Sequence, residues 1–317
     1  MSYETDTTFG EPDTAYEEVK YRLSQFVNDH ILLVLLGPAL VVITAIFIYP
    51  VLQLFRQSFY LTLPGVPSRF IGLGNYTDML GRDEFWTYFR HTLVYSFGSL
   101  ALSLGGGLCV ALAINHVTHR RLRNTYSTVM MFAWAIPIAV VALIWKWIFT
   151  GNKLGLINMI LMDLGILDQP YAWLAQQNLA MAIVTFTDAW ARLPFAMIVL
   201  LAGLQSIPNH MYDAAKVDGA TTFQTFRAIT LPYLRPYIAI VALMNWMFAF
   251  RAFAIIFPLS RGGPGTRTTV FSLYIYREGM INFDYGYASA IATFIILISL
   301  IVAVIYVTKI MGGVQDE

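Results

Sequence analysis

The chain has 317 residues, of which 57% are hydrophobic and 12% charged, and its mean hydropathy is +0.61. These values are too apolar for an ordinary soluble domain, so we predict a polytopic membrane protein. A net charge of +1 provides no basic surface for nucleic acid, which we exclude as a partner. The single cysteine, Cys109, excludes a disulfide framework, and we expect it to be a small buried hydrophobe.

The first 29 residues are polar and mostly acidic. A signal peptide needs a basic start followed at once by a short apolar core, and this segment has neither. We therefore predict that residues 1–29 form a polar cytosolic tail. A second, shorter cytosolic tail is expected at residues 311–317.

Six long apolar runs follow, each able to cross a bilayer core of about 30 Å as a helix. Continuous apolar runs differ from the alternating pattern of membrane β-barrel strands, so the predicted fold class is all-α. Residues 30–310 are expected to form one transmembrane domain of six helices. The predicted spans are residues 31–55, 92–117, 126–149, 179–205, 237–259 and 287–307.

These spans predict a multi-pass protein of the cell membrane (the inner or plasma membrane). The lipid bilayer is then in contact with several of its helices. Lys and Arg are divided evenly between the two sides of the membrane. The dense turn His119-Arg-Arg-Leu-Arg123 favours the cytoplasmic side, because positive charge in short loops marks that side most strongly. Both termini are then cytoplasmic.

The sequence lacks the motifs of an enzyme or of a cofactor-binding protein. A Walker loop requires G-x-x-x-x-G-K-[ST], which occurs nowhere, and Gly262-Gly-Pro-Gly265 does not replace it. The histidines have no metal-binding spacing. We therefore predict no catalytic residue, metal or cofactor in this chain.

Charged residues inside the spans are candidates for a solute path, because an Arg at mid-membrane costs about 2.5–3.5 kcal/mol on insertion scales. Asp188 and Arg192 are four residues apart and can pair along one helix face, with Trp190 between them. The pair either lines the path or is structural.

A second candidate is the stretch Asn245 to Phe253, which contains Trp246, Phe248, Phe250 and Arg251. Asn245 and Phe248 share a helix face, and an amide beside aromatic rings can hold a sugar through hydroxyl hydrogen bonds and ring stacking. Arg251 lies off that face. The alternative for the aromatic residues is ordinary helix packing.

A polar segment between the fourth and fifth runs predicts a helix–turn–helix at the membrane surface. Pro208 or Asn209 starts the first helix, Gly219 supplies a left-handed exit, and Thr221 or Thr222 caps a second helix that Pro232 ends. The segment either binds a partner or only connects two spans. Its candidate contact residues are Asp213, Ala214, Ala215, Asp218, Gly219, Leu231 and Pro232.

The spacing of Asp213-Ala-Ala, Gly219 and Ile229-Thr-Leu-Pro232 resembles the EAA loop of permease subunits in binding-protein-dependent ABC importers. This chain has Asp where the family usually has Glu. Further motifs are similar to those of the carbohydrate-uptake branch, typified by maltose, trehalose and glycerol-phosphate permeases. They are Phe70-Ile-Gly-Leu-Gly-Asn-Tyr76, Trp190-Ala-Arg-Leu-Pro-Phe195, Leu201-Ala-Gly-Leu-Gln-Ser-Ile-Pro208, Gly262-Gly-Pro264 and Leu273-Tyr-Ile-Tyr276.

The resemblance implies a fold like that of type I importer permeases and a larger assembly. It implies a second homologous permease, two ATPase subunits that hold ATP and Mg, and an extracytoplasmic solute-binding protein that delivers a sugar. Cytosolic residues 206–236 then couple ATP hydrolysis to alternating access. The alternatives are a non-sugar solute such as glycerol phosphate or a polyamine, or a stand-alone secondary transporter or membrane enzyme.

Overall fold

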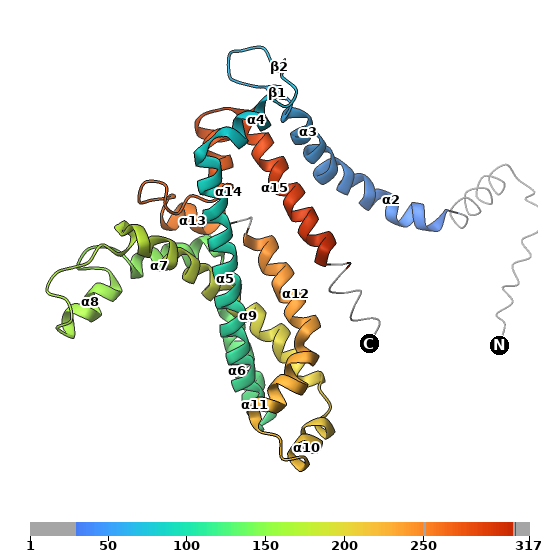
Figure 1. Ribbon diagram of the computed structural model, residues 1–317, viewed down its shortest axis with the longest axis vertical. Coiled ribbons are helices and arrows are strands. Elements are labelled where there is room, and N and C mark those ends of the chain that lie inside the picture. The colour runs from blue at the N-terminus through green and yellow to red at the C-terminus, as the bar shows by residue number, and fades with distance from the viewer. Residues whose placement is uncertain (1–29, 250–251, 307, 309–317) are drawn as a thin grey trace, which may run out of the picture. The chain divides into compact units, whose positions relative to one another are not determined.

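The computed structural model describes residues 30–249, 252–306 and 308, and it divides the chain into two compact units (Figure 1). One unit ends at Arg56 and the other begins at Gln57. The predicted tails, residues 1–29 and 311–317, lie outside the described residues.

The described part of the first unit is one apolar helix. It consists of α2 (Ile31–Ile43), a π-helical turn η1 (Thr44–Ile48) and α3 (Tyr49–Gln57). The backbone stays helical at both junctions, so the first predicted span is confirmed. No part of its apolar window is buried within this unit.

The second unit contains the remaining helices and one short two-stranded antiparallel ribbon. In chain order its elements are β1 (Tyr60–Leu61), β2 (Arg69–Phe70), α4 (Gly74–Gly81), α5 (Asp83–Asn115), α6 (Arg120–Ala135), α7 (Ile138–Ile148), α8 (Leu156–Asp163), η2 (Trp173–Ala175), α9 (Gln177–Ser206), α10 (Asn209–Val217), α11 (Thr222–Thr225), η3 (Phe226–Thr230), α12 (Leu231–Ala249), α13 (Phe253–Leu259), α14 (Phe271–Tyr276), η4 (Arg277–Ile281) and α15 (Tyr285–Ile305).

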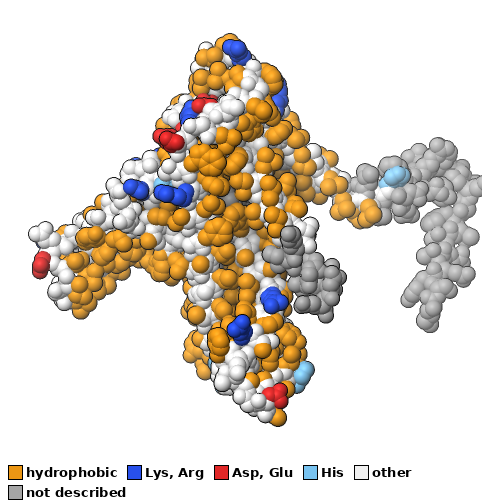
Figure 2. Space-filling view, in the orientation of Figure 1, with side chains coloured by type: hydrophobic (Ala, Val, Ile, Leu, Met, Phe, Trp, Pro, Cys, Tyr) orange, Lys and Arg blue, Asp and Glu red, His pale blue; other side chains and the backbone are white. Residues whose placement is uncertain are grey.

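Among the described residues, five helical stretches are long and apolar enough to cross a membrane, and the bent pair α6–α7 makes a sixth if it is one span. The all-α class is confirmed. Within the second unit, α10 and α11 lie at one end, and α4 with the β1–β2 ribbon lies at the other (Figure 1). Apolar side chains cover the flank between these ends (Figure 2).

The third predicted span, residues 126–149, is wrong as a single straight helix. The structure ends α6 at Ala135 and starts α7 at Ile138, with an angle of 90° between them. Pro137 causes the break, because proline lacks a backbone N–H and disfavours helical backbone in the residue before it. Ile136 is accordingly extended, with ψ at 129°.

The fifth predicted span, residues 237–259, is also wrong as one helix. Helix α12 starts earlier, at Leu231, and ends at Ala249, and α13 is a separate helix that starts at Phe253. No proline lies between positions 237 and 257, so the local sequence gives no reason for a break there.

The most extensive helix pairing in the second unit is between α5 and α9. The two backbones approach closely at Gly107, where an added Cβ would lie 2.7 Å from the Ala196 Cβ and 3.0 Å from the Met197 nitrogen. Small residues permit such contact in membranes, where van der Waals packing holds helices together. Helix α12 packs against both α5 and α9, so these three helices form the centre of the bundle.

The segments that were predicted to lie outside the membrane are folded. Asn158 is fully buried, and its amide nitrogen donates to the carbonyls of Thr150, Asn152 and Tyr171 at 3.0–3.1 Å. Asn75 of the Phe70–Tyr76 motif is similarly buried. Its amide nitrogen donates to two backbone carbonyls of the segment before the ribbon's turn, at 2.8 and 3.0 Å.

The prediction that Cys109 is buried is wrong. Cys109 lies on α5 and is exposed. Its helix presents Gly107, not Cys109, to α9, so Cys109 belongs to the outward face of the bundle, where lipid or another chain covers it.

We expect Gly107→Ala to lower the thermal unfolding midpoint of the purified protein in detergent, because the new methyl group overlaps α9. Overpacking of this kind costs about 1–3 kcal/mol. The matched control is Gly105→Ala on the same helix, where no atom lies within 4 Å of the added Cβ. The control should gain about 0.5–1 kcal/mol, because alanine favours a helix more than glycine does. Equal midpoints in the two variants would contradict the close contact.

Candidate functional site

The polar segment after α9 folds as predicted over its first half. Helix α10 starts at Asn209, and Gly219 follows its end with a φ of 73°. The Gly219 N–H donates to the Lys216 carbonyl and the Ala220 N–H to the Ala215 carbonyl. This pair of bonds is a Schellman motif, which needs a left-handed residue that glycine provides without strain.

The second half of the segment corrects one prediction. Thr221 caps α11 in a capping box with Gln224, as expected. However, Pro232 does not end this helix. Helix α11 continues through the π-helical turn η3 into α12, and Pro232 is the second residue of α12. The wider turn directly before the proline is where the helix adjusts to the missing N–H.

The loop exposes charge at its surface and buries one small side chain. Asp213 and Lys216 are exposed and form an ion pair at 3.5 Å, and Asp218 is also exposed. Ala215 is the buried member of the Asp213-Ala-Ala motif, and Ala214 is exposed. Backbone hydrogen bonds therefore hold the loop in shape, and its carboxylates remain exposed to a partner.

The sequence interpretation missed two apolar side chains on the loop. Val217 is 86% exposed and Phe223 is 71% exposed, although both are large hydrophobic residues. The sequence does contain a sign of this exposure, because both apolar residues stand inside an otherwise polar segment. An open groove of about 490 Å³ lies between α10 and the α11–η3 helix. Its lining is mostly small or apolar: His210, Met211, Ala214, Ala215, Asp218, Ala220, Gln224, Thr225, Ala228 and Ile229.

Inside the bundle, Asp188 and Arg192 pair as their spacing predicted. The Arg192 Nε donates to Asp188 Oδ2 and its Nη2 to Asp188 Oδ1, both at 2.7 Å. Asp188 is fully buried, and the Arg192 side chain is 14% exposed. Ser99 of α5 donates to Asp188 Oδ2 at 2.5 Å, and the Tyr95 hydroxyl lies beside the pair. The carboxylate is thus compensated from two helices.

Arg192 also contacts the last turn of α12. Its Nη2 lies 3.4 Å from the Phe248 carbonyl, and the guanidinium carbon lies 4.8 Å from the centre of the Phe248 ring. The final carbonyls of a helix have no intrahelical donor, and a bilayer supplies no water to replace one. Arg192 therefore holds α12 to α9 close to Ala249, the last residue of α12 that the structure describes.

Asn245 lies one turn before Phe248 and is 4% exposed. Its amide nitrogen donates to the Val241 carbonyl at 3.0 Å. Its Oδ1 atom is buried and has no hydrogen-bond partner among the residues that the structure describes. A buried acceptor of this kind needs an explanation, such as a bound group.

The other candidate path residues lie elsewhere. Trp190 packs edge-on against Trp145 of α7, away from the Asp188–Arg192 side of α9. Trp246 packs against Phe97 of α5, with the ring centres 5.6 Å apart. Phe250 and Arg251 lie outside the described residues. The structure therefore brings Asp188, Arg192 and Phe248 together, near Asn245 on α12.

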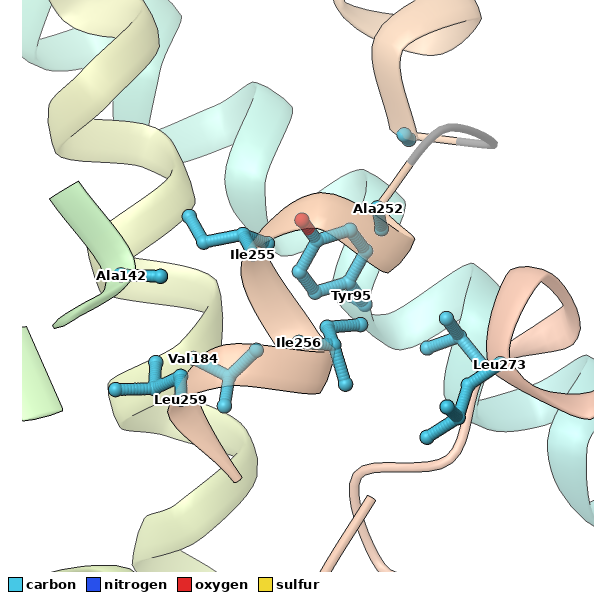
Figure 3. Close-up of a cluster of buried hydrophobic side chains, with 10 residues drawn as sticks. Tyr95, Ala142, Val184, Ala252, Ile255, Ile256, Leu259 and Leu273 are labelled. Carbon is cyan, nitrogen blue, oxygen red and sulfur yellow. The ribbon is translucent and has the colours of Figure 1, made fainter. Parts of the chain in front are cut away.

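Helix α13 is held by a cluster of apolar side chains shown in Figure 3. Ile255, Ile256 and Leu259 of α13 are buried with Val184 of α9 and Tyr95 of α5. The end of α13 is also capped by a cation, because Lys146 Nζ of α7 donates to the Pro258 carbonyl at 3.2 Å. A carbonyl near the last described residue of α12 and one near the end of α13 therefore each accept from a cation of another helix.

The family model that matches this chain is "Binding-protein-dependent transport system inner membrane component", over residues 103–310. The chain is 36% identical to the trehalose/maltose transport system permease protein MalF of Thermococcus litoralis, over 83% of this chain and 88% of that protein. It is 34% identical to the sulfoquinovosyl glycerol transport system permease protein SmoG of Agrobacterium fabrum, over 88% and 90% of the two chains.

Among solved structures, the chain is similar to a bacterial ABC transporter involved in the import of the acidic polysaccharide alginate. The TM-score is 0.76 and the sequence identity 27%, with 90% of this chain and 96% of that chain covered. The likeness therefore extends over almost the whole fold.

Proposed function

Since the chain belongs to the family of binding-protein-dependent transport system inner membrane components, in its carbohydrate-uptake branch, we propose that it moves a sugar into the cytoplasm by alternating access. It is a multi-pass transport permease and not an enzyme. The proposed solute is a mono-, di- or oligosaccharide. The proposal is carried by the similarity of the chain to sugar permeases, which include a trehalose/maltose permease and an arabinooligosaccharide permease.

The energy for transport comes, in this proposal, from two ATPase subunits that hold ATP and Mg. The supporting feature is the loop between α9 and α12, whose carboxylates and two large apolar side chains face outward. Exposed apolar residues beside charge are typical of a docking surface. Asp213, Ala214, Ala215, Asp218, Gly219, Leu231 and Pro232 belong to this coupling loop within residues 206–236.

The coupling loop then lies in the cytoplasm, which puts both termini on the same side. The folded segments at the opposite end of the second unit face the solute-binding protein. A second homologous permease covers part of the apolar flank. Support for the binding-protein partner comes from the family description, which refers to a binding-protein-dependent system.

The proposed solute path runs past Asn245 and Phe248 on α12. Support comes from the buried, unpartnered Asn245 Oδ1, which can accept a hydrogen bond from a sugar hydroxyl, and from a ring that can stack on a sugar face. Asp188 and Arg192 of α9 lie beside Phe248 in this region. Trp190 and Trp246 pack on other helices, and Phe250 and Arg251 follow the region in the sequence.

Affinity purification of the tagged chain from its native membrane tests the assembly. We expect it to carry two ATPase subunits, a second permease and a binding protein, whose bound solute mass spectrometry identifies. Reconstituted uptake should require both ATP and that binding protein. Uptake that an uncoupler abolishes at constant ATP would instead indicate a secondary transporter.

We expect Gly219→Pro to reduce the solute transported per ATP hydrolysed while membrane insertion stays intact. Proline cannot adopt the left-handed backbone or donate the N–H that closes the loop. The matched control is Gly165→Pro, which changes the same motif, with a φ of 68°, after α8. Transport and ATP hydrolysis should stay coupled in the control. Full coupling in both variants would make the loop a simple connector.

We expect Asn245→Ala to raise the KM for uptake about fivefold, because one hydrogen bond contributes about 1 kcal/mol. The amount of assembled complex should change less. The control is Thr293→Val on α15, which removes a different buried polar group, a hydroxyl without a described partner, and should leave the KM unchanged. An unchanged KM in Asn245→Ala would remove this residue from the solute path.

A further inference from the structure

We propose that Arg192 is a positioning residue for transport, acting in a clamp made of Ser99, Asp188, Arg192 and the Phe248 carbonyl. The clamp makes the middle of α9 and the part of α12 that is far from the coupling loop move as one body. This inference rests on the proposed function, because it concerns how movement of the loop reaches the solute path.

The clamp joins the three central helices of the bundle. Ser99 comes from α5, Asp188 and Arg192 come from α9, and Phe248 comes from α12. One guanidinium binds both the Asp188 carboxylate and the Phe248 carbonyl, and it lies against the Phe248 ring. Planar, forked donors make such bridging specific to arginine, and the ammonium of a lysine cannot reproduce it.

The position of the clamp gives it a mechanical role. Helix α9 leads directly into the coupling loop, and α12 emerges from it without interruption. At 1.5 Å per residue, Arg192 is about 21 Å of helix from the loop and Phe248 about 25 Å. Near the loop, the Tyr237 hydroxyl of α12 donates to the Ser206 hydroxyl of α9 at 3.2 Å. Hydrogen bonds thus join α9 and α12 at two levels, one beside the loop and one at the middle of α9.

Two other roles for the pair make different predictions. If it only stabilises the fold, apolar residues of similar volume can replace it, since such exchanges of buried ion pairs are often neutral. If it contacts solute, its loss raises the KM. Contact through Asp188 conflicts with its full burial and with the donors that already bind both carboxylate oxygens.

The test uses the complete transporter in proteoliposomes, with its ATPase subunits and its solute-loaded binding protein. Three changes are compared at equal amounts of assembled complex: Arg192→Lys, Asp188→Leu with Arg192→Met, and the reversed pair Asp188→Arg with Arg192→Asp. In each, we expect solute uptake per ATP hydrolysed to fall about tenfold, within the range of coupling between linked sites. The KM should stay near the wild-type value.

The reversed pair is the most informative variant, because it keeps an ion pair in the membrane but moves the guanidinium one helical turn away from the Phe248 carbonyl. If the pair has only a structural role, the reversed pair should restore the coupling of uptake to ATP hydrolysis. If the clamp is correct, coupling should stay low. The control is Gly105→Ala on α5, where no atom lies within 4 Å of the added Cβ, and it should leave coupling unchanged.

Unchanged uptake per ATP in Arg192→Lys, or rescue by the reversed pair, would overturn the clamp. A raised KM with normal uptake per ATP at saturating solute would assign the pair to solute contact instead. If the transporter with the apolar pair fails to assemble, Arg192→Lys tests the clamp without it, because lysine keeps a positive charge beside Asp188. Failure of the proposed function is visible separately, as wild-type uptake that needs neither ATP nor the binding protein.

Discussion

The bilayer leaves no water for backbone groups, and this constraint explains why a helix that stops inside it must find a donor elsewhere. In this chain the interrupted fifth span is stabilised by two cations. Arg192 reaches the Phe248 carbonyl at the end of α12, and Lys146 reaches the Pro258 carbonyl at the end of α13. A cation near the negative end of a helix is also favoured by the helix dipole.

The same arrangement links the interrupted span to the rest of the bundle. Arg192 keeps its charge in the membrane because Asp188 compensates it, and Asp188 is buried because Ser99 and Arg192 satisfy its oxygens. The same two helices approach closely at Gly107, about 12 Å along α5 from Ser99, where the absence of a side chain permits the contact. Packing and electrostatics therefore support each other at the centre of the second unit, and the coupling loop is attached directly to two of its three helices.

The coupling loop follows a different principle, since most of its structure is local. A Schellman motif at Gly219 and a capping box at Thr221 shape it with few tertiary contacts, apart from a hydrogen bond between Tyr212 and Thr230. Because these local hydrogen bonds hold the loop, its carboxylates and the side chains of Val217 and Phe223 remain at the surface. A loop built in this way keeps its shape while the helices attached to it move.

The sequence by itself determined the all-α class, most span positions, the pairing of Asp188 with Arg192 and the first half of the loop, because apolar length, i to i+4 spacing and the conformation of glycine are local properties. It also contained the reason for the break at Pro137, although the apolar run concealed it. The break after Ala249, the continuation of the helix through Pro232 and the exposure of Cys109 were decided only by the tertiary structure. The exposure of Cys109 depends on which helix face packs inward. The contacts of α12 and α13 with Arg192 and Lys146 come from other helices, and neighbouring residues do not reveal them.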